Sequence, residues 1–114
     1  MLHTDLPIMN DKEGHFVPDG FPRVIDSHVH IFPSKIFSSI WSWFDQNAWK
    51  IRYQMDTSHL IGFLLDHGVS HVVALQYAHK PGIAELLNLY MAKKCEEFKG
   101  RVTGMATVFP GESD

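Results

Sequence analysis

The sequence contains a single cysteine, Cys95, and lacks the basic start of a secretory leader. A lone thiol cannot form an internal disulfide bond, and disulfide frameworks are typical of small secreted domains. The first ten residues hold no Lys or Arg ahead of an apolar stretch, which a secretory signal requires. We therefore expect a cytoplasmic protein.

Excess positive charge and long apolar runs are also missing. The chain has 10 Lys and Arg against 13 Asp and Glu, a net charge of −3. It therefore lacks the general basic surface that binds phosphate backbones, and no nucleic-acid partner is expected. The longest apolar stretch, residues 60–65 around Gly62, falls far short of the roughly 20 residues that cross a bilayer, so no membrane partner is expected either.

Several common catalytic and nucleotide-binding motifs are absent. The sequence has no Gly-x-Gly-x-x-Gly, Walker A, Gly-x-Ser-x-Gly or Cys-x-x-Cys pattern, so nucleotide binding and Ser-triad chemistry have no support. What it does have is an ordinary globular balance of 45% apolar and 20% charged residues, together with eight histidines. Neutral imidazole is the commonest protein ligand for transition metals, so the spacing of these histidines decides whether a metal site is present.

Proline and glycine divide the chain into two regions. Residues 1–22 are interrupted by Pro or Gly at five positions, and we interpret them as an N-terminal arm. Residues 23–114 alternate between strand and helix patterns, which indicates an α/β fold with crossover helices over three parallel strands. The apolar run 72–75 predicts a strand buried on both faces. Strands are expected near 23–31, 70–77 and 102–109, and helices near 34–44, 57–67 and 82–98.

Local signals predict where the helices begin and end. Ser34 is expected to be the N-cap of the first helix, and Asp56 or Thr57 that of the second. Gly68 suits the left-handed position that ends the second helix. Pro81 suits the first position of the third helix.

Two histidines lie close to the end of the first predicted strand. Residues two apart on a strand point to the same face, so alternation places Asp26, His28 and His30 together. Two imidazoles on one face can reach one ion about 2.0 to 2.1 Å from each nitrogen, which makes the pair half of a zinc site. The carboxyl ends of parallel strands also carry the chemistry in such folds. The alternative is that a chance His-x-His pair is merely polar at a strand end.

Residues 24–33 (Val-Ile-Asp-Ser-His-Val-His-Ile-Phe-Pro) resemble the opening of the amidohydrolase superfamily. The resemblance is closest to the amidohydrolase-2 branch of metal-dependent hydrolases and decarboxylases. In that family an Asp-x-His-x-His sequence ends the first strand of a (β/α)8 TIM barrel, and its two His bind a divalent metal. Residues 66–73 and 102–110 are similar to the second and third strand regions, so the resemblance covers residues 23–112.

The resemblance implies roles for three residues. His28 and His30 match the metal ligands, Zn²⁺ is the expected ion, and Asp26 is a supporting candidate beside them. A TIM barrel needs about 250 residues, so the remaining ligands and the general base would lie beyond Asp114. The implied fold is thus the N-terminal portion of a TIM barrel, and this chain alone is expected to be inactive. The catalytic residues stay unknown, and the oligomeric state stays open.

Further residues are candidates for contact with a small-molecule substrate. His79, followed by Lys80, comes after the second predicted strand and is expected at the same carboxyl end as the His pair. Arg52 lies in an aromatic-rich insertion, residues 34–55, and can pair with a carboxylate. The insertion is either a roof over an apolar pocket or ordinary core, and a solvated loop also explains His79 and Arg52. The substrate implied is a small organic acid, lactone or amide.

A second reading from a different class of protein remains open. The chain can be a small non-catalytic α/β interaction module in which His28 and His30 are a structural pair. Three parallel strands on their own leave two open edges, which compact proteins usually avoid. This argument favours the N-terminal fragment of an enzyme over the module.

Overall fold

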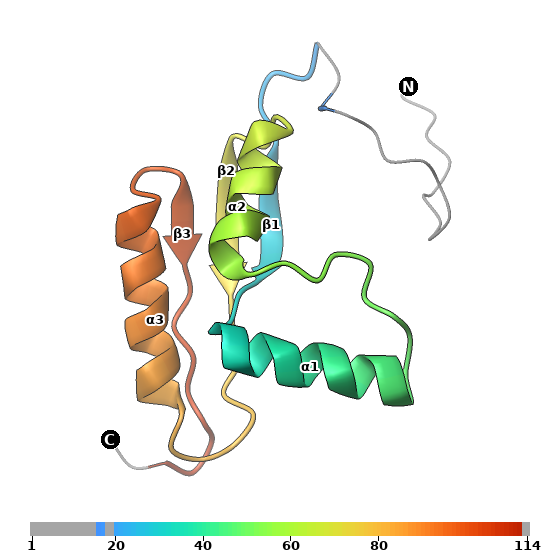
Figure 1. Cartoon of the computed structure of the whole chain (residues 1–114). Coiled ribbons are helices and arrows are strands. Elements are labelled where there is room, and N and C mark those ends of the chain that lie inside the picture. Colours follow the sequence, from blue (N-terminus) through green and yellow to red (C-terminus); the bar gives the residue numbers. More distant parts are fainter. Residues whose placement is uncertain (1–15, 18–19, 113–114) are drawn as a thin grey trace.

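The chain alternates between strands and helices in the order that its sequence predicts. The computed structural model describes residues 16–17 and 20–112, and Figure 1 shows their path. The elements in chain order are β1 (Ile25–His30), α1 (Ser34–Asn47), α2 (Thr57–Asp66), β2 (His71–Leu75), α3 (Ala84–Glu97) and β3 (Val102–Gly104).

The three strands form one parallel sheet in the order β1-β2-β3. Ile25 pairs with His71 at the start of β1, and Val72 pairs with Val102 between β2 and β3. Every neighbour in the sheet is also a neighbour among the strands of the chain, and each connection contains a helix. The α/β class and the parallel sheet are therefore confirmed.

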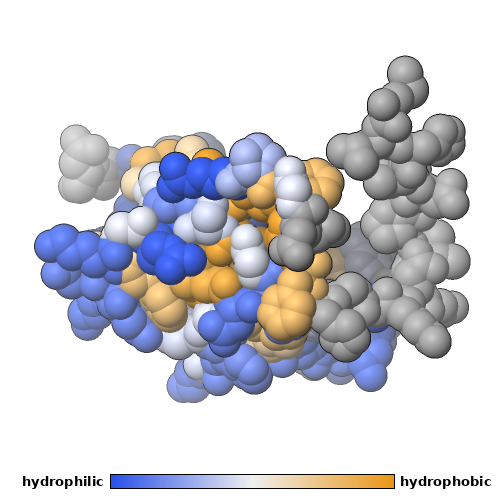
Figure 2. Space-filling view, turned by 90° about the horizontal axis from the view of Figure 1, so that it is seen from above, coloured by the Kyte–Doolittle hydropathy of each residue, from blue (hydrophilic) through white to orange (hydrophobic). Residues whose placement is uncertain are grey.

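One face of the sheet is covered by α2 and α3. Ile61 of α2 and Met91 of α3 are buried in one cluster with side chains from all three strands. In β2 only alternate residues join it, because Val72 and Ala74 are fully buried while Val73 and Leu75 stay partly exposed. The prediction that this strand is buried on both faces is wrong, since no described element covers the second face. Figure 2, seen from the end at which the strands begin, shows hydrophobic residues gathered between hydrophilic ones.

Helix α1 lies across the carboxyl ends of β1 and β2 rather than on the sheet (Figure 1). A second buried cluster holds it there, formed by Phe32 after β1, Phe37 of α1 and Leu87 of α3. The buried Thr57 hydroxyl donates a hydrogen bond of 3.1 Å to the Phe32 carbonyl oxygen, which ties the start of α2 to the same place. The carboxyl end of the sheet is therefore braced by residues from α1, α2 and α3.

The predicted end of the second helix is confirmed at Gly68, whose φ is +98°. The Gly68 amide donates to the Leu65 carbonyl and the Val69 amide to the Leu64 carbonyl, which is the Schellman pattern. A Cβ at Gly68 would also lie 3.1 Å from Cβ of Val17. Asp56 is the N-cap of this helix, as predicted, although its side chain makes no capping hydrogen bond.

Two predicted helix starts are displaced. Pro33, not Ser34, is the N-cap of α1, because the Pro33 carbonyl accepts the first hydrogen bonds of the helix. Pro81 lies outside α3, which begins at Ala84 after a turn at Gly82 with φ +85°. The turn uses the fixed φ of proline before the helix rather than within it.

The third strand is shorter than predicted and ends at Gly104 instead of 109. Beyond it, the Thr107 amide donates to Asn88 Oδ1 at 2.8 Å, and Asn88 Nδ2 donates to the Thr107 carbonyl at 2.9 Å. The Asn88 side chain on α3 thus takes the hydrogen bonds that a neighbouring strand would otherwise take. Residue patterns alone do not distinguish such a side-chain partner from a strand.

The predicted N-terminal arm, residues 1–22, lies largely outside the described residues, as do residues 113–114. Of the described part, the Val17 amide donates to the His67 carbonyl oxygen at 2.8 Å. Among the residues that the structure covers, none of the helices combines the length and the apolar character that a membrane span needs.

The packing of β3 against α3 predicts the effect of substituting Gly104. A Cβ added there would lie 2.5 Å from Met91 Cγ and 2.6 Å from Cys95 Sγ. We expect Gly104→Ala to lower the free energy of unfolding by about 1–3 kcal/mol, because the added methyl overpacks this contact. Urea unfolding followed by circular dichroism measures the change.

Gly62→Ala is the matched control. Gly62 lies in α2 with no atom within 4 Å of an added Cβ, so the substitution should raise stability by up to about 1 kcal/mol through helix propensity. If Gly104→Ala is as stable as Gly62→Ala, the close contact between β3 and α3 is not present in solution.

Candidate metal centre and adjoining pocket

A β-bulge shapes the end of β1. Asp26 pairs with Val72 and Val29 pairs with Ala74, so β1 holds one residue more than β2 between these pairs. The predicted strict alternation from Asp26 to His30 is therefore broken, and Asp26 is in register with a residue buried under the helices. Its Oδ1 accepts a hydrogen bond of 3.2 Å from the His28 backbone amide, which spans the bulge. Asp26 thus supports the backbone of His28.

The two histidines that flank Val29 converge. Val29 is buried under the helices, whereas His28 and His30 are both exposed. Their Nε2 atoms lie 3.1 Å apart, and the rings meet edge to face. Two nitrogens bound about 2.0–2.1 Å from one ion are separated by about 2.9 Å at a right angle and about 3.3 Å at a tetrahedral angle. The observed spacing falls between these values and fits two ligands of one metal ion.

Aromatic rings position His30. The Phe32 ring stacks on it at a centroid distance of 6.4 Å, and the Tyr77 ring meets its edge at 5.7 Å. Burial lowers the pKa of His30 below its usual value of 6.5, and the neighbouring His28 lowers it further. The neutral imidazole that a metal ligand must be is therefore favoured at this position.

A complete metal site is not formed within residues 16–17 and 20–112. No group of three His, Cys, Asp or Glu side chains comes together there. His71, the nearest His along β2, begins that strand and has its Nε2 2.7 Å from Thr103 Oγ1. The described residues bring two candidate ligands together, so any others would have to come from outside them.

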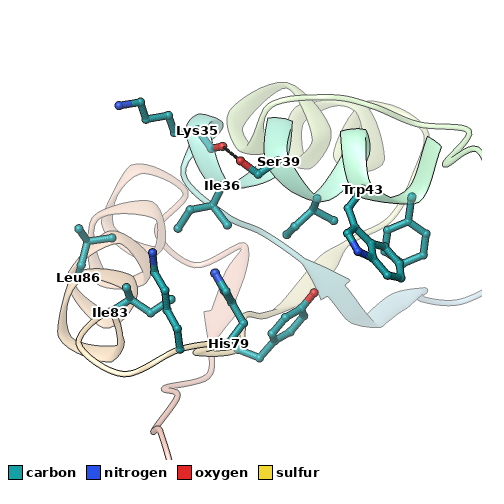
Figure 3. A pocket seen from close by; sticks show the side chains of 11 residues that line it. Lys35, Ile36, Ser39, Trp43, His79, Ile83 and Leu86 are labelled. Atoms are coloured by element: carbon teal, nitrogen blue, oxygen red, sulfur yellow. Dashed lines mark hydrogen bonds between the residues drawn. The ribbon is translucent and has the colours of Figure 1, made fainter. Parts of the chain in front are cut away.

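A pocket of about 610 Å³ adjoins the His pair at the carboxyl end of the sheet. It lies between α1 and the segment that joins β2 to α3, and Figure 3 shows the side chains around it. His79 and Lys80 line it, as does Tyr77, whose ring also contacts His30. His79 therefore lies in the segment between β2 and α3, at the carboxyl end of the sheet, as predicted.

Arg52 is separated from this pocket in the structure. It lies in the loop between α1 and α2, and its guanidinium carbon is 5.5 Å from the centre of the Tyr53 ring. Neither residue lines the pocket. A substrate contact by Arg52 therefore has no geometric support from the pocket, whereas one by His79 does.

One part of the aromatic insertion is core and another part lines the pocket. Phe37 is buried, with the Trp41 ring stacked on it at 5.1 Å, so this side of α1 is core. Trp43 and Phe44 instead line the pocket, and Trp43 remains 56% exposed. The residue that sequence reasoning missed is Tyr77, because a tyrosine after a strand carries no signal of which neighbour it will contact.

Comparison with known proteins gives no assignment: no family model, no curated protein and no solved structure matches the chain.

The surroundings of His30 predict its titration in the metal-free protein. The pKa of His30 is lower in the folded protein than in the unfolded chain, so the unfolded chain binds more protons just below pH 6.5. The contribution of His30 therefore makes the fold less stable as the pH falls through that range. We expect the ring signals of His30 to titrate below 6.5 in an NMR titration with chelator present. His28→Gln should raise the midpoint only part of the way, because burial remains. A midpoint at or above 6.5 in the unmodified protein would contradict this environment.

Proposed function

We propose that this chain is the N-terminal part of a metal-dependent hydrolase or non-oxidative decarboxylase of the amidohydrolase type. In this proposal β1, β2 and β3 are the first three strands of a (β/α)8 TIM barrel. The substrate is a small organic acid, lactone or amide, and the ion is Zn²⁺. The protein acts in the cytoplasm.

The observation that carries the proposal is the convergence of His28 and His30. Their Nε2 atoms lie 3.1 Å apart at the carboxyl end of a parallel strand. That end is where enzymes with parallel sheets keep their reacting groups. The pocket beside Tyr77 adds a concave surface at the same end, where a substrate can approach the ion.

The residues of this chain hold and orient the ion. When bound, Zn²⁺ would lower the pKa of a coordinated water toward about 7 or polarise a substrate oxygen. His28 and His30 are the ligands, through Nε2. Asp26 fixes the backbone of His28 through its carboxylate, and the Phe32 and Tyr77 rings limit the rotation of His30. The other ligands and the general base would lie outside the described residues. Hydrolysis and decarboxylation would both use the same ion, held by this pair.

The assignment predicts that metal content and activity fall together in His variants. In the intact enzyme His28→Ala and His30→Ala should each remove a ligand and lower both, measured by elemental analysis of the purified proteins and by turnover. Asp26→Asn should be milder, about 10- to 100-fold in metal affinity, because it acts through the His28 backbone. His71→Ala is the matched control, because His71 begins β2, at the other end of the sheet from the His pair. Its Nε2 lies 2.7 Å from Oγ1 of Thr103 in β3. Full metal content in both His28→Ala and His30→Ala would rule out the assignment.

A non-catalytic interaction module is the second candidate. The Nε2 to Nε2 distance of 3.1 Å is also that of a hydrogen bond, so one neutral ring can donate to the other with no ion present. The absence of a third ligand within residues 16–17 and 20–112 favours this reading as well. Metal analysis of the intact protein distinguishes the two candidates, because the interaction module would bind no metal at all.

The isolated chain provides a further test. Residues 1–114 by themselves should be inactive, hold Zn²⁺ loosely and unfold at low denaturant concentration, since catalytic sites supply three protein ligands and one sheet face is left open. Zinc titration by calorimetry measures the affinity, urea unfolding measures the stability, and a turnover assay measures the activity. A cooperative monomer that holds one equivalent of Zn²⁺ tightly would contradict the fragment proposal and indicate a self-contained site.

A further inference from the structure

The pocket beside the His pair has a charge that differs from that of the chain as a whole. The chain carries a net charge of −3 with 13 Asp and Glu, yet none of the acidic residues within 16–17 and 20–112 lines the pocket. The lining instead includes two lysines, Lys35 and Lys80, together with His79. A concave surface with this lining favours an anion over a neutral or cationic ligand.

Lys80 and His79 are not committed to other described residues. The ion pair found in the part of the chain that the structure covers joins Lys94 to Glu97, away from the pocket. Neither Lys80 nor His79 has a hydrogen bond or an ion pair to another described side chain. Figure 3 shows His79 directed from the β2–α3 segment toward α1, while Lys35 extends away from the centre. Lys80 and His79 are therefore available for charged and polar contacts with a ligand, beside Ser39 and Tyr77, whose hydroxyl-bearing side chains also line the pocket.

The remaining wall of the pocket is apolar. Ile36, Ile40 and Trp43 come from α1, and Ile83 and Leu86 come from the opposite side. Two of these are strongly exposed for large apolar residues, Trp43 at 56% and Leu86 at 54%. Such side chains gain free energy when a ligand removes them from water. A small inorganic anion would leave them exposed.

We propose that this pocket binds a small organic anion with an aromatic or branched apolar body. Lys80 and His79 contact its anionic group, and the apolar body lies between the Ile36–Trp43 side of α1 and Leu86. This rests on the proposed function in one respect: among the substrates considered, it selects an organic acid over a neutral lactone or amide. Tyr77, which lines the pocket and contacts His30, places the bound anion next to the His pair.

The test compares two probes that differ in charge and share a ring system, 2-naphthoate and 2-naphthamide. Affinities are measured by calorimetry on the purified protein with chelator present, so that no metal contributes. We expect 2-naphthoate to bind at least about threefold more tightly than the amide, a modest ratio because Lys80 is solvent-exposed. NMR shift changes should centre on Ile36, Trp43 and Ile83.

Three variants locate the effect. Lys80→Gln should remove most of the preference for the carboxylate, and Trp43→Ala should weaken both probes by a similar factor. Lys99→Gln is the control, because Lys99 is exposed after α3 and lies outside the pocket. Equal affinities for the two probes, no binding of either, or loss of the preference in Lys99→Gln would each overturn the proposal.

The outcome is independent of the test of the metal site. If His28→Ala and His30→Ala retain the metal but the carboxylate preference is present, the pocket stands and the metal assignment fails. If the metal is lost in these variants but both probes bind equally, the metal assignment stands and the anion pocket fails.

Discussion

Parallel pairing of β1 with β2 is the constraint on which the rest of the structure depends. A parallel pair cannot be closed by a tight turn, so the chain must cross over, and α1 and α2 form that crossover. Parallel pairing also brings the carboxyl ends of both strands to one edge. The last hydrogen bond at that edge runs from the Ile31 amide to the Leu75 carbonyl, at 2.9 Å. The His pair lies on β1 just before this bond, and the pocket lies beyond it, between α1 and the segment that joins β2 to α3.

The bulge in β1 adjusts what this edge presents. The extra residue brings His28 and His30 out on either side of the buried Val29, while Asp26 stays in register with Val72. The carboxylate of Asp26 accepts a hydrogen bond from the His28 amide within this bulge. A carboxylate two residues before a His is therefore explained here by backbone geometry.

Sequence reasoning predicted the elements well and the contacts between them poorly. The order of strands and helices, the Gly68 end of α2 and the shared side of His28 and His30 follow from local periodicity and backbone preference, which act within a few residues. The early end of β3 depends on Asn88, 19 residues from Thr107, and no local signal reports such a partner. The contact of Tyr77 with His30 likewise joins residues that are far apart in the sequence. The bulge at residues 27–28 also escaped prediction, since alternation of residue types continues through it.

The order of the sheet has a consequence for how the protein is made. Each strand pairs with the strand that precedes it in the chain, so β2 finds its partner already synthesised, and β3 then finds β2. The sheet can therefore grow from its N-terminal strand while the C-terminal part of the chain is still on the ribosome. During that growth the edge that takes the next strand is always that of the newest strand. The His pair, on the first strand, is in place before the pocket that adjoins it is closed by α3.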